Sequence, residues 1–412
     1  MAEAVSKLLT FTAFAYLARL YGPVGYGYIE WAGTVLMCAS LIVDQGFSAY
    51  GSREIARSPS DTGRLVAEVV TARFLLAVTA YAAIGGLAYL MTADRAISSL
   101  LLVYGLSLWA LPLLLQWVFQ GHDMMLVGGI IQVIRQSIFA LVEFLIVQGS
   151  ADLVWVGVAE VAGVSAAAAF SVWMYIRYFK RDLTLRPNFS RKLFREGTPI
   201  GLSQMFWVLK MFGATLIVGL IATAEDTGYF AGAMRIFIAL HTFVWINFFN
   251  LLPTLSRAWV QGPEEQMATI IGSSMRVVLA ASIVVGVIWV ASAPIVMTGA
   301  YGTAFRPGAT ALQWLAGACI AAAISGHYRY GLIAGGHQGK EMFAMALGSI
   351  LIIPLIPFGY FNAGIAGAAA ALFAAECVVL VSSWLLARHY LFITRESITG
   401  GETLTTAPEA TP

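Results

Sequence analysis

Twelve apolar runs, each close to twenty residues long, dominate the sequence and restrict it to membrane folds. An α-helix needs about twenty predominantly apolar residues to cross the hydrocarbon core of a bilayer. Hydrophobic residues fill 59% of the 412 positions and charged residues only 11%, against roughly 25% charged residues in an average soluble protein. We therefore predict an all-α integral membrane protein with about twelve transmembrane helices, at residues 4–21, 28–50, 66–91, 98–119, 124–148, 152–176, 197–222, 228–255, 268–296, 309–334, 340–361 and 363–389.

Three landmarks occur twice in the same order along these runs. A break with Gly-Tyr follows the first run of each half, as "YGPVGYGY" and as "AEDTGYF". A Gly-His pair follows the fourth run of each half, in "FQGHDM" and in "AGGHQG". Trp173 precedes Arg177 by four residues at the end of the sixth run, as Trp384 precedes Arg388 at the end of the twelfth. These matches predict two six-helix lobes, which an even number of spans relates by a pseudo-two-fold axis along the membrane normal.

The duplication and one long polar connector define the predicted domains. We predict an N-lobe at 1–177 and a C-lobe at 197–389, joined by a basic linker at 178–196. The final segment, 390–412, is predicted to be a disordered tail because it is polar and terminal.

The positions of Lys and Arg predict the orientation in the membrane. Most of those near the ends of the runs gather on the side of the linker and the C-terminus, while the other side has little beyond Arg19, Arg95 and Arg306. Cytoplasmic loops carry the excess of Lys and Arg. We therefore expect a multi-pass protein of the cell (inner) membrane, with both termini, the linker and the tail in the cytoplasm.

Several segments also carry a family resemblance, in order and spacing over nearly the whole chain. These are "ARLYGPVGYG", "LIVDQGFSAYGSREIAR", "FQGHDMM", "FREGTPIGLSQ" and "TGYFAGAMRI". They resemble the polysaccharide-transporter branch of the multidrug/oligosaccharidyl-lipid/polysaccharide exporter superfamily. The resemblance implies a central cavity lined mainly by helices 1, 2, 7 and 8. It also implies a flippase that moves polyprenyl-diphosphate-linked oligosaccharide repeat units across the membrane by alternating access.

Charged side chains inside the apolar runs are the first candidates for a substrate site, because each is costly to insert into a bilayer. Lys210 is predicted near mid-bilayer on the seventh helix, and Gln204 and Trp207 precede it at three-residue spacing on the same face. An ammonium group in a partly desolvated cavity would bind a diphosphate strongly. A lysine paired with a carboxylate for packing alone is the competing interpretation.

Four further residues complete the predicted diphosphate site or cavity. Arg235 and His241 lie on the eighth helix, and Lys7 and Arg19 flank the first. Arg binds phosphate in a planar fork geometry, although snorkelling of Arg235 towards the headgroups explains it equally well.

Five residues are candidates for coupling or gating. Arg135 and Glu143 on the fifth helix, with Glu160 on the sixth, are predicted to form a charge network that closes the N-lobe. Glu376 on the twelfth helix is a candidate proton carrier or a structural residue. Asp44, in "VDQG", is expected to cap a helix or to pair with Arg53 or Arg57 in a cytoplasmic gate.

Other classes of function lack their residue patterns. The sequence has no catalytic motif, its five histidines are scattered without metal-ligand spacing, and "GGHQGKEMF" lacks the Ser or Thr of a phosphate-binding loop. We expect no enzymatic activity, no cofactor, no metal and no nucleic-acid partner. Membrane lipids are expected partners from the composition, and the resemblance implies the lipid-linked substrate, polysaccharide polymerase and other assembly proteins as further partners. A monomer should suffice, because one chain supplies both lobes.

Two related functions stay open at this stage. A cation-coupled multidrug exporter of the same superfamily would require acidic residues in the cavity, where this sequence offers more cations. A lipid II flippase is the other alternative. Short extracytoplasmic loops disfavour a glycan polymerase or ligase, and a passive membrane scaffold would not explain the duplication.

Overall fold

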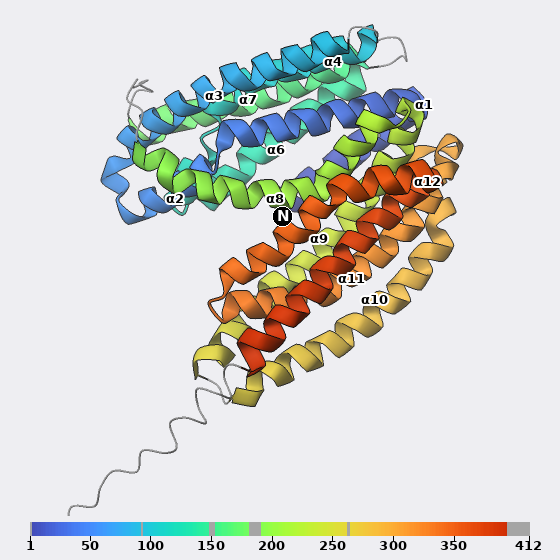
Figure 1. The fold of residues 1–412 in the computed structure, drawn as a ribbon. Coiled ribbons are helices and arrows are strands. Elements are labelled where there is room, and N and C mark those ends of the chain that lie inside the picture. The colour runs from blue at the N-terminus through green and yellow to red at the C-terminus, as the bar shows by residue number, and fades with distance from the viewer. Residues whose placement is uncertain (1, 92–93, 148–152, 181–190, 262–263, 394–412) are drawn as a thin grey trace, which may run out of the picture. The chain divides into compact units, whose positions relative to one another are not determined.

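The computed structural model describes residues 2–91, 94–147, 153–180, 191–261 and 264–393, and within these ranges it is helical without strands (Figure 1). Nine helical segments of these residues are long and apolar enough to cross a membrane. Two of the nine segments each hold two membrane-length helices, because α1 (Ala2–Asp44) breaks at Gly22 and α12 (Gln338–Ala387) breaks at Gly364. Together with α9 (Ala224–Gln261) they account for the twelve predicted spans.

The two internal breaks have a backbone cause. Gly22 has φ 65° and Gly364 has φ 58°, a left-handed conformation that glycine adopts without the steric cost of a Cβ atom. Pro23 follows the first break directly and has no N–H group to donate into the preceding turn. The first of the two predicted Gly-Tyr breaks is therefore a real change of helix direction.

By internal packing the chain divides into two compact units, residues 1–231 with 298–305, and residues 232–297 with 306–412. These units and the predicted lobes divide the chain at different residues, and the lobe boundaries stay a prediction. The part of the predicted linker at 181–190 and the tail at 394–412 lie outside the described residues. Residues 390–393 of the predicted tail belong to a helical turn, Arg388–Ile393, which continues α12.

The first unit is a bundle of helices. Helix α1 packs against α3, α4, α6 and α8, and α7 packs against α4 and α6 (Figure 1). The bounds are α2 (Phe47–Arg57), α3 (Thr62–Leu90), α4 (Arg95–Leu106), α5 (Gln116–Gly121), α6 (Met125–Ile146), α7 (Val154–Phe179) and α8 (Arg191–Ile221). Short 3₁₀ turns lie at Pro59–Asp61 (η1), Ser107–Trp109 (η2) and Leu111–Leu113 (η3).

Two of the predicted helices of this unit are wrong in detail. The second predicted span, 28–50, ends at Asp44, because Gln45 and Gly46 both take positive φ before α2 begins. The fourth, 98–119, is interrupted by the turns η2 and η3 around Pro112, which cannot donate a helical hydrogen bond. The first interruption directly follows Asp44 and the second comes shortly before Gln116, two polar residues that line a cavity described below.

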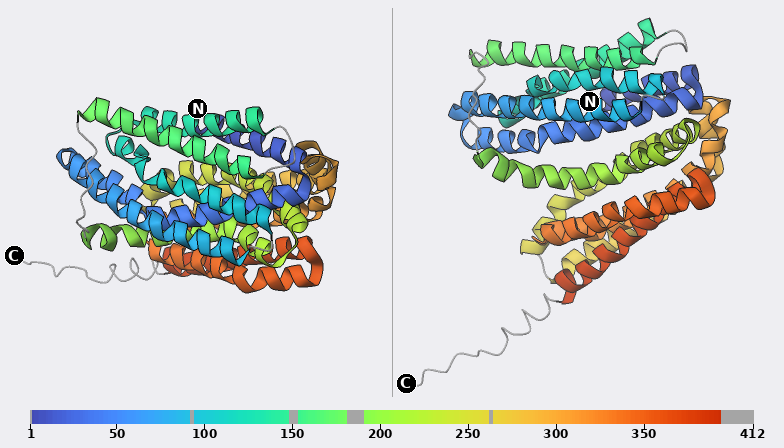
Figure 2. Two further views of the ribbon diagram at one scale, coloured as in Figure 1. Left: turned by 90° about the horizontal axis from the view of Figure 1, so that it is seen from above. Right: turned by 45° about the horizontal axis from the view of Figure 1, so that its top comes forward.

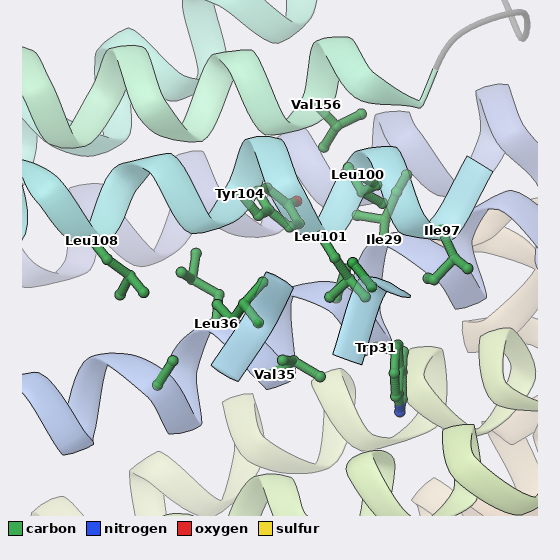
Figure 3. Close-up of a cluster of buried hydrophobic side chains, with 14 of the residues drawn as sticks. Ile29, Trp31, Val35, Leu36, Ile97, Leu100, Leu101, Tyr104, Leu108 and Val156 are labelled. Carbon is green, nitrogen blue, oxygen red and sulfur yellow. The ribbon is translucent and has the colours of Figure 1, made fainter. Parts of the chain in front are cut away.

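The core of the first unit forms where α1, α4 and α7 meet (Figure 3). Ile29, Val35 and Leu36 of α1 interlock with Leu100 and Leu101 of α4, all nearly inaccessible to solvent. Each fully buried side chain of this size contributes about 1.5–3 kcal/mol in an aqueous reference. In a bilayer, close van der Waals packing of the same side chains holds the helices together.

The second unit contains most of α9 together with α10 (Glu264–Tyr301, up to Met297), α11 (Ala309–Ala334) and α12. A 3₁₀ turn, η4 (Thr303–Gly308), precedes α11. The four helices run alongside one another (Figures 1 and 2), and α11 packs along α12. Only 17% of the most apolar window of α10 is buried, so its valine and isoleucine side chains form a surface suited to contact lipid.

The two other repeated landmarks have matching local structures in the two halves. The first Gly-His pair ends α5 and the second follows the end of α11. The guanidinium carbon of Arg177 lies 5.6 Å from the centre of the Trp173 ring, and that of Arg388 lies 5.9 Å from the Trp384 ring. Both cation–π pairs sit at the ends of corresponding helices, where amphipathic side chains favour the membrane interface.

Candidate functional site

Helix α8 lies along α1 within the first unit, and α1 makes close backbone contacts beyond one end of α8, at the start of α9, and at the other end of α8 itself. At the Gly27 end, which we define by Pro23, Gly27, Ala224 and Gly228, the backbones of α1 and the start of α9 touch. A Cβ atom on Gly27 would overlap the carbonyl oxygen of Ala224, and one on Gly228 would overlap that of Pro23. Only glycine allows this reciprocal approach.

The Gly46 end, at the other end of α8, is built in the same way. It comprises Gly46, Gly197 and Gly201, with the turn between α1 and α2 pressed against α8. A Cβ atom on Gly201 would lie 2.6 Å from the carbonyl oxygen of Gln45, closer than real Cβ contacts. The side chain of Thr198 donates a hydrogen bond to Gln45 Oε1 at 3.1 Å.

Ion pairs reinforce the Gly46 end. Arg53 Nη2 lies 2.7 Å from Glu196 Oε2, and Lys192 Nζ lies 3.3 Å from Glu54 Oε2. The hydrogen bond to Glu54 raises the pKa of the Lys192 ammonium group. These side chains are partly exposed, so the Arg53–Glu196 pair contributes roughly 0–1 kcal/mol and solvent weakens the Lys192–Glu54 pair, which leaves the contact able to open.

Polar contacts and a small cavity accompany the Gly27 end. Trp31 Nε1 donates to the carbonyl oxygen of Leu216 at 3.1 Å, and Tyr28 donates its hydroxyl hydrogen to Asp94. A cavity of about 300 Å³ is lined by these two aromatic side chains, Asp94 and Thr227, among others. Helix α1 is therefore held to the α8–α9 segment at both ends, with the length of α8 between them.

Lys210 lies on α8 between the two ends, about 14 Å along the helix axis from Gly201. Its side chain is 2% exposed, whereas Gln204 and Trp207 of the predicted stripe are exposed. The stripe therefore changes from accessible to buried along α8. Among the membrane cations predicted from sequence whose side chains the structure describes, Lys210 is the most deeply enclosed.

The other predicted cavity cations of the first unit lie near the N-terminus of the chain. Arg19 donates from Nε to the carbonyl oxygen of Ala300 at 3.0 Å and from Nη2 to that of Gly299. Its charge thus neutralises the C-terminal end of α10, where carbonyl groups lack helical donors. Lys7 lies on the first turns of α1, and its side chain is outside the described part of the structure.

The second unit holds three of the predicted residues. Arg235 and His241 are half-buried on α9, and the His241 ring packs 5.6 Å from that of Phe237. Glu376 on α12 is buried, with 1% of its surface exposed. A cavity shared by Arg235 and Lys210 stays a prediction.

The predicted charge network of the fifth and sixth spans is partly formed. Arg135 on α6 and Glu160 on α7 make an ion pair with 2.5 Å between Nη2 and Oε1. Glu143 is fully buried, and neither of its carboxyl oxygens has a hydrogen-bond partner among the described residues. The network therefore consists of one ion pair, with Glu143 outside it.

The expected pairing of Asp44 with Arg53 or Arg57 is wrong. Asp44 pairs instead with Arg73 of α3, and its Oδ1 also accepts hydrogen bonds from the backbone N–H and the hydroxyl group of Ser48. The change of chain direction at residues 45–46 explains this arrangement, because it presents the end of α1 to α3. Asp44 still caps α2, as its bond to the Ser48 N–H shows.

Arg73 is the main residue that the sequence analysis missed. It lies in the predicted span 66–91, and its side chain is only 4% exposed. A charge inside an apolar run was a sufficient signal, but α3 was not among the helices expected to line a cavity. Arg329 of α11, paired with Glu341 of α12 through Nε at 2.8 Å, was missed for the same reason.

Removing Arg73 should destabilise the protein strongly. In Arg73→Met, Asp44 keeps its charge in a half-buried position without its guanidinium partner, which costs about 3 kcal/mol of unfolding free energy. Thermal unfolding of the purified protein in detergent measures this loss. The matched variant Arg64→Met breaks an exposed pair with Asp61 on the same helix and should cost less than about 1 kcal/mol. Equal losses in the two variants would contradict the importance of the buried pair.

Comparison with known proteins identifies the family. The profile of the polysaccharide biosynthesis protein family matches residues 1–259. The chain belongs to this family. No match was found among the curated proteins.

Solved structures establish the fold. An inward-facing multidrug resistance MATE family transporter of the MOP superfamily is similar with a TM-score of 0.77 and 13% identity, over 95% of this chain and 96% of that one. The lipid II flippase MurJ in an inward closed conformation gives 0.74 and 12%, over 99% and 93%. A MOP superfamily transporter from Pyrococcus furiosus, described as having a binding pocket of reverse polarity, gives 0.60 and 15%, over 96% of each chain. The chain is thus a multi-pass membrane protein of the polysaccharide biosynthesis family with the two-lobed MOP fold.

Proposed function

We propose that this protein is a flippase that moves polyprenyl-diphosphate-linked oligosaccharide repeat units across the cell membrane for surface polysaccharide synthesis. The family match over residues 1–259 is the observation that carries the proposal. The fold, which it shares with transporters named for drugs and for lipid II, is compatible with a flippase. In this proposal the linker side of the protein faces the cytoplasm.

The proposed mechanism is alternating access. The Gly46 end, on the predicted cytoplasmic side, opens to admit the diphosphate and sugars, while the polyprenyl chain stays in the bilayer. The Gly27 end then opens to release the headgroup outside. Glycine contacts and weak ion pairs suit such ends, because close packing makes each closed state well defined while surface ion pairs cost little to break.

Lys210 and Arg235 are the proposed contacts to the diphosphate. Lys210 supports this role because it is a buried cation between the two ends of α8. Arg235 supplies the fork geometry that matches a phosphate group. Lys7, Gln204, Trp207 and His241 remain proposed contacts, whereas Arg19 holds the end of α10 in the conformation described.

Depletion of the protein in its host tests the proposed function. Finished lipid-linked repeat units should accumulate in the cytoplasmic leaflet and surface polymer should be lost, because synthesis continues while transfer stops. Mass spectrometry of the polyprenyl-diphosphate fraction, with a leaflet-selective probe, measures both effects. Accumulation of lipid II alone would identify a lipid II flippase. Normal lipid intermediates and normal polymer would overturn the proposal and leave drug or cation transport to be tested.

A further inference from the structure

A cavity lined by polar side chains and by apolar ones such as Leu41, Leu111 and Leu114 lies inside the first unit, beside the Gly46 end and without a contribution from α8. Its volume is about 320 Å³, at the lower limit of small-molecule pockets, which span about 300–1,000 Å³. Side chains from α1, α2, α3 and α5 line it. The polar ones that matter here are Ser40, Asp44, Ser48, Arg73, Gln116 and Gln120.

The charges that line this cavity cancel. Arg73 Nη2 donates to Asp44 Oδ1 and to the hydroxyl oxygen of Ser48. Arg73 would repel a free cation, and Asp44 would repel a free anion. The pair therefore gives neither kind of ion a strong binding site. The cavity is suited to a neutral ligand.

Hydrogen-bonding capacity in the cavity is left unused. The side-chain amides of Gln116 and Gln120 make no hydrogen bond to any described residue, and four residues separate them on α5, so they share one face. Arg73 Nε and Trp117 Nε1, which also line the cavity, are buried and have no hydrogen-bond partner in the part of the chain that the structure describes. Each amide provides two donors and an acceptor with two lone pairs.

This combination of donors and acceptors around a neutral pair matches the hydroxyl groups of a sugar. We infer that the cavity formed by Asp44, Arg73, Gln116 and Gln120 binds a neutral sugar ring of the oligosaccharide that the protein transports. The identification of that ring as part of the substrate rests on the proposed function. The cavity then recognises the sugars separately from the site around Lys210, which is proposed for the diphosphate.

Saturation-transfer NMR on the protein in lipid nanodiscs tests the inference, because the method detects millimolar affinities. The probes are glucose, N-acetylglucosamine, glucuronate and inorganic phosphate as competitor. At least one neutral sugar should give saturable transfer, and glucuronate should give less, because its carboxylate meets Asp44. Phosphate should not compete.

Gln116→Leu and Gln120→Leu should each weaken sugar binding by about three- to tenfold, the effect of one lost hydrogen bond. Gln132→Leu on α6 is the matched control, since Gln132 does not line the cavity, and it should bind as the unchanged protein does. Leucine keeps the side-chain size, and thermal unfolding of each variant checks the fold. If one variant fails to fold, the other carries the test.

Two results would overturn the inference. One is the absence of transfer to any neutral sugar, and the other is equal binding by Gln120→Leu and Gln132→Leu. Loss of binding with normal flipping of the lipid-linked substrate would refute the sugar cavity alone. Normal sugar binding without any flipping would refute the proposed function alone.

Discussion

Gly27→Val is expected to reduce polymer export strongly while the protein still inserts into the membrane. The first side-chain atom would overlap the carbonyl oxygen of Ala224 and lie 2.9 Å from the backbone nitrogen of Gly228. Overpacking of this kind costs about 1–3 kcal/mol, which shifts the balance against the conformation closed at the Gly27 end by about 5- to 150-fold. The protein should then remain open at this end.

The opposite shift is expected for Gly201→Val. Its Cβ atom would lie 2.5 Å from the carbonyl carbon of Gln45, so that the Gly46 end cannot close. The two variants should therefore show opposite patterns of labelling when single cysteines are placed along α8 and reacted with a membrane-impermeant reagent from each side. Export should fall in both.

Gly33→Val provides the matched control, since Gly33 lies on α1 and a Cβ atom there meets nothing within 4 Å. It should export normally and label as the unchanged protein does. If Gly27→Val and Gly201→Val labelled alike, or if either exported at the normal rate, the two glycine contacts would not be the alternating closures.

The spans could be predicted from sequence because the membrane imposes a length and a composition on each. The predicted helix 309–334 coincides with α11 in both bounds, and the break after the first span is visible as Gly22 before Pro23. These features depend on local chemistry alone. Nearby residues and the bilayer determine them without reference to the rest of the fold.

The turn at Gln45 and Gly46 shows why other features could not be predicted. Phe47, Ala49 and Tyr50 follow the turn before the first charged residue, so hydropathy gives no boundary there. Gly46 takes its positive φ where its backbone meets Gly197 and Gly201, which lie about 150 residues further along the chain. A contact of that range is a property of the packed molecule.

The same limit applies to the candidate site. A single sequence indicates that Asp44, Arg73, Arg135 and Glu160 are charges in apolar surroundings, but it does not indicate which of them pair. Arg53 and Arg57 were the expected partners of Asp44, and the pairing with Arg73 followed from the approach of α3 to the end of α1. Residue type therefore predicted that ion pairs exist, and the fold selected the partners.

Lys210→Glu is expected to reduce flipping by about a thousandfold or more while leaving membrane insertion intact. A unit charge about 4 Å from a phosphate oxygen contributes about 4 kcal/mol at an effective dielectric constant of 20, and the substitution turns attraction into repulsion. Lys210→Arg should retain much of the rate, because it keeps the charge. Lys210→Met should lose it, because it keeps the length and the burial but not the charge.

Transfer of a labelled polyprenyl-diphosphate oligosaccharide in vesicles measures the flipping rate. Thermal unfolding of each variant shows whether a lower rate comes from a loss of stability instead. Arg191→Glu is the matched control, since Arg191 is an exposed cation at the start of the same helix, and it should flip normally. Because Lys210 is 2% exposed with both ends of α8 held to α1, it meets substrate only after the Gly46 end opens. Full export by Lys210→Glu would exclude Lys210 from the mechanism and leave Arg235 as the first candidate for the diphosphate.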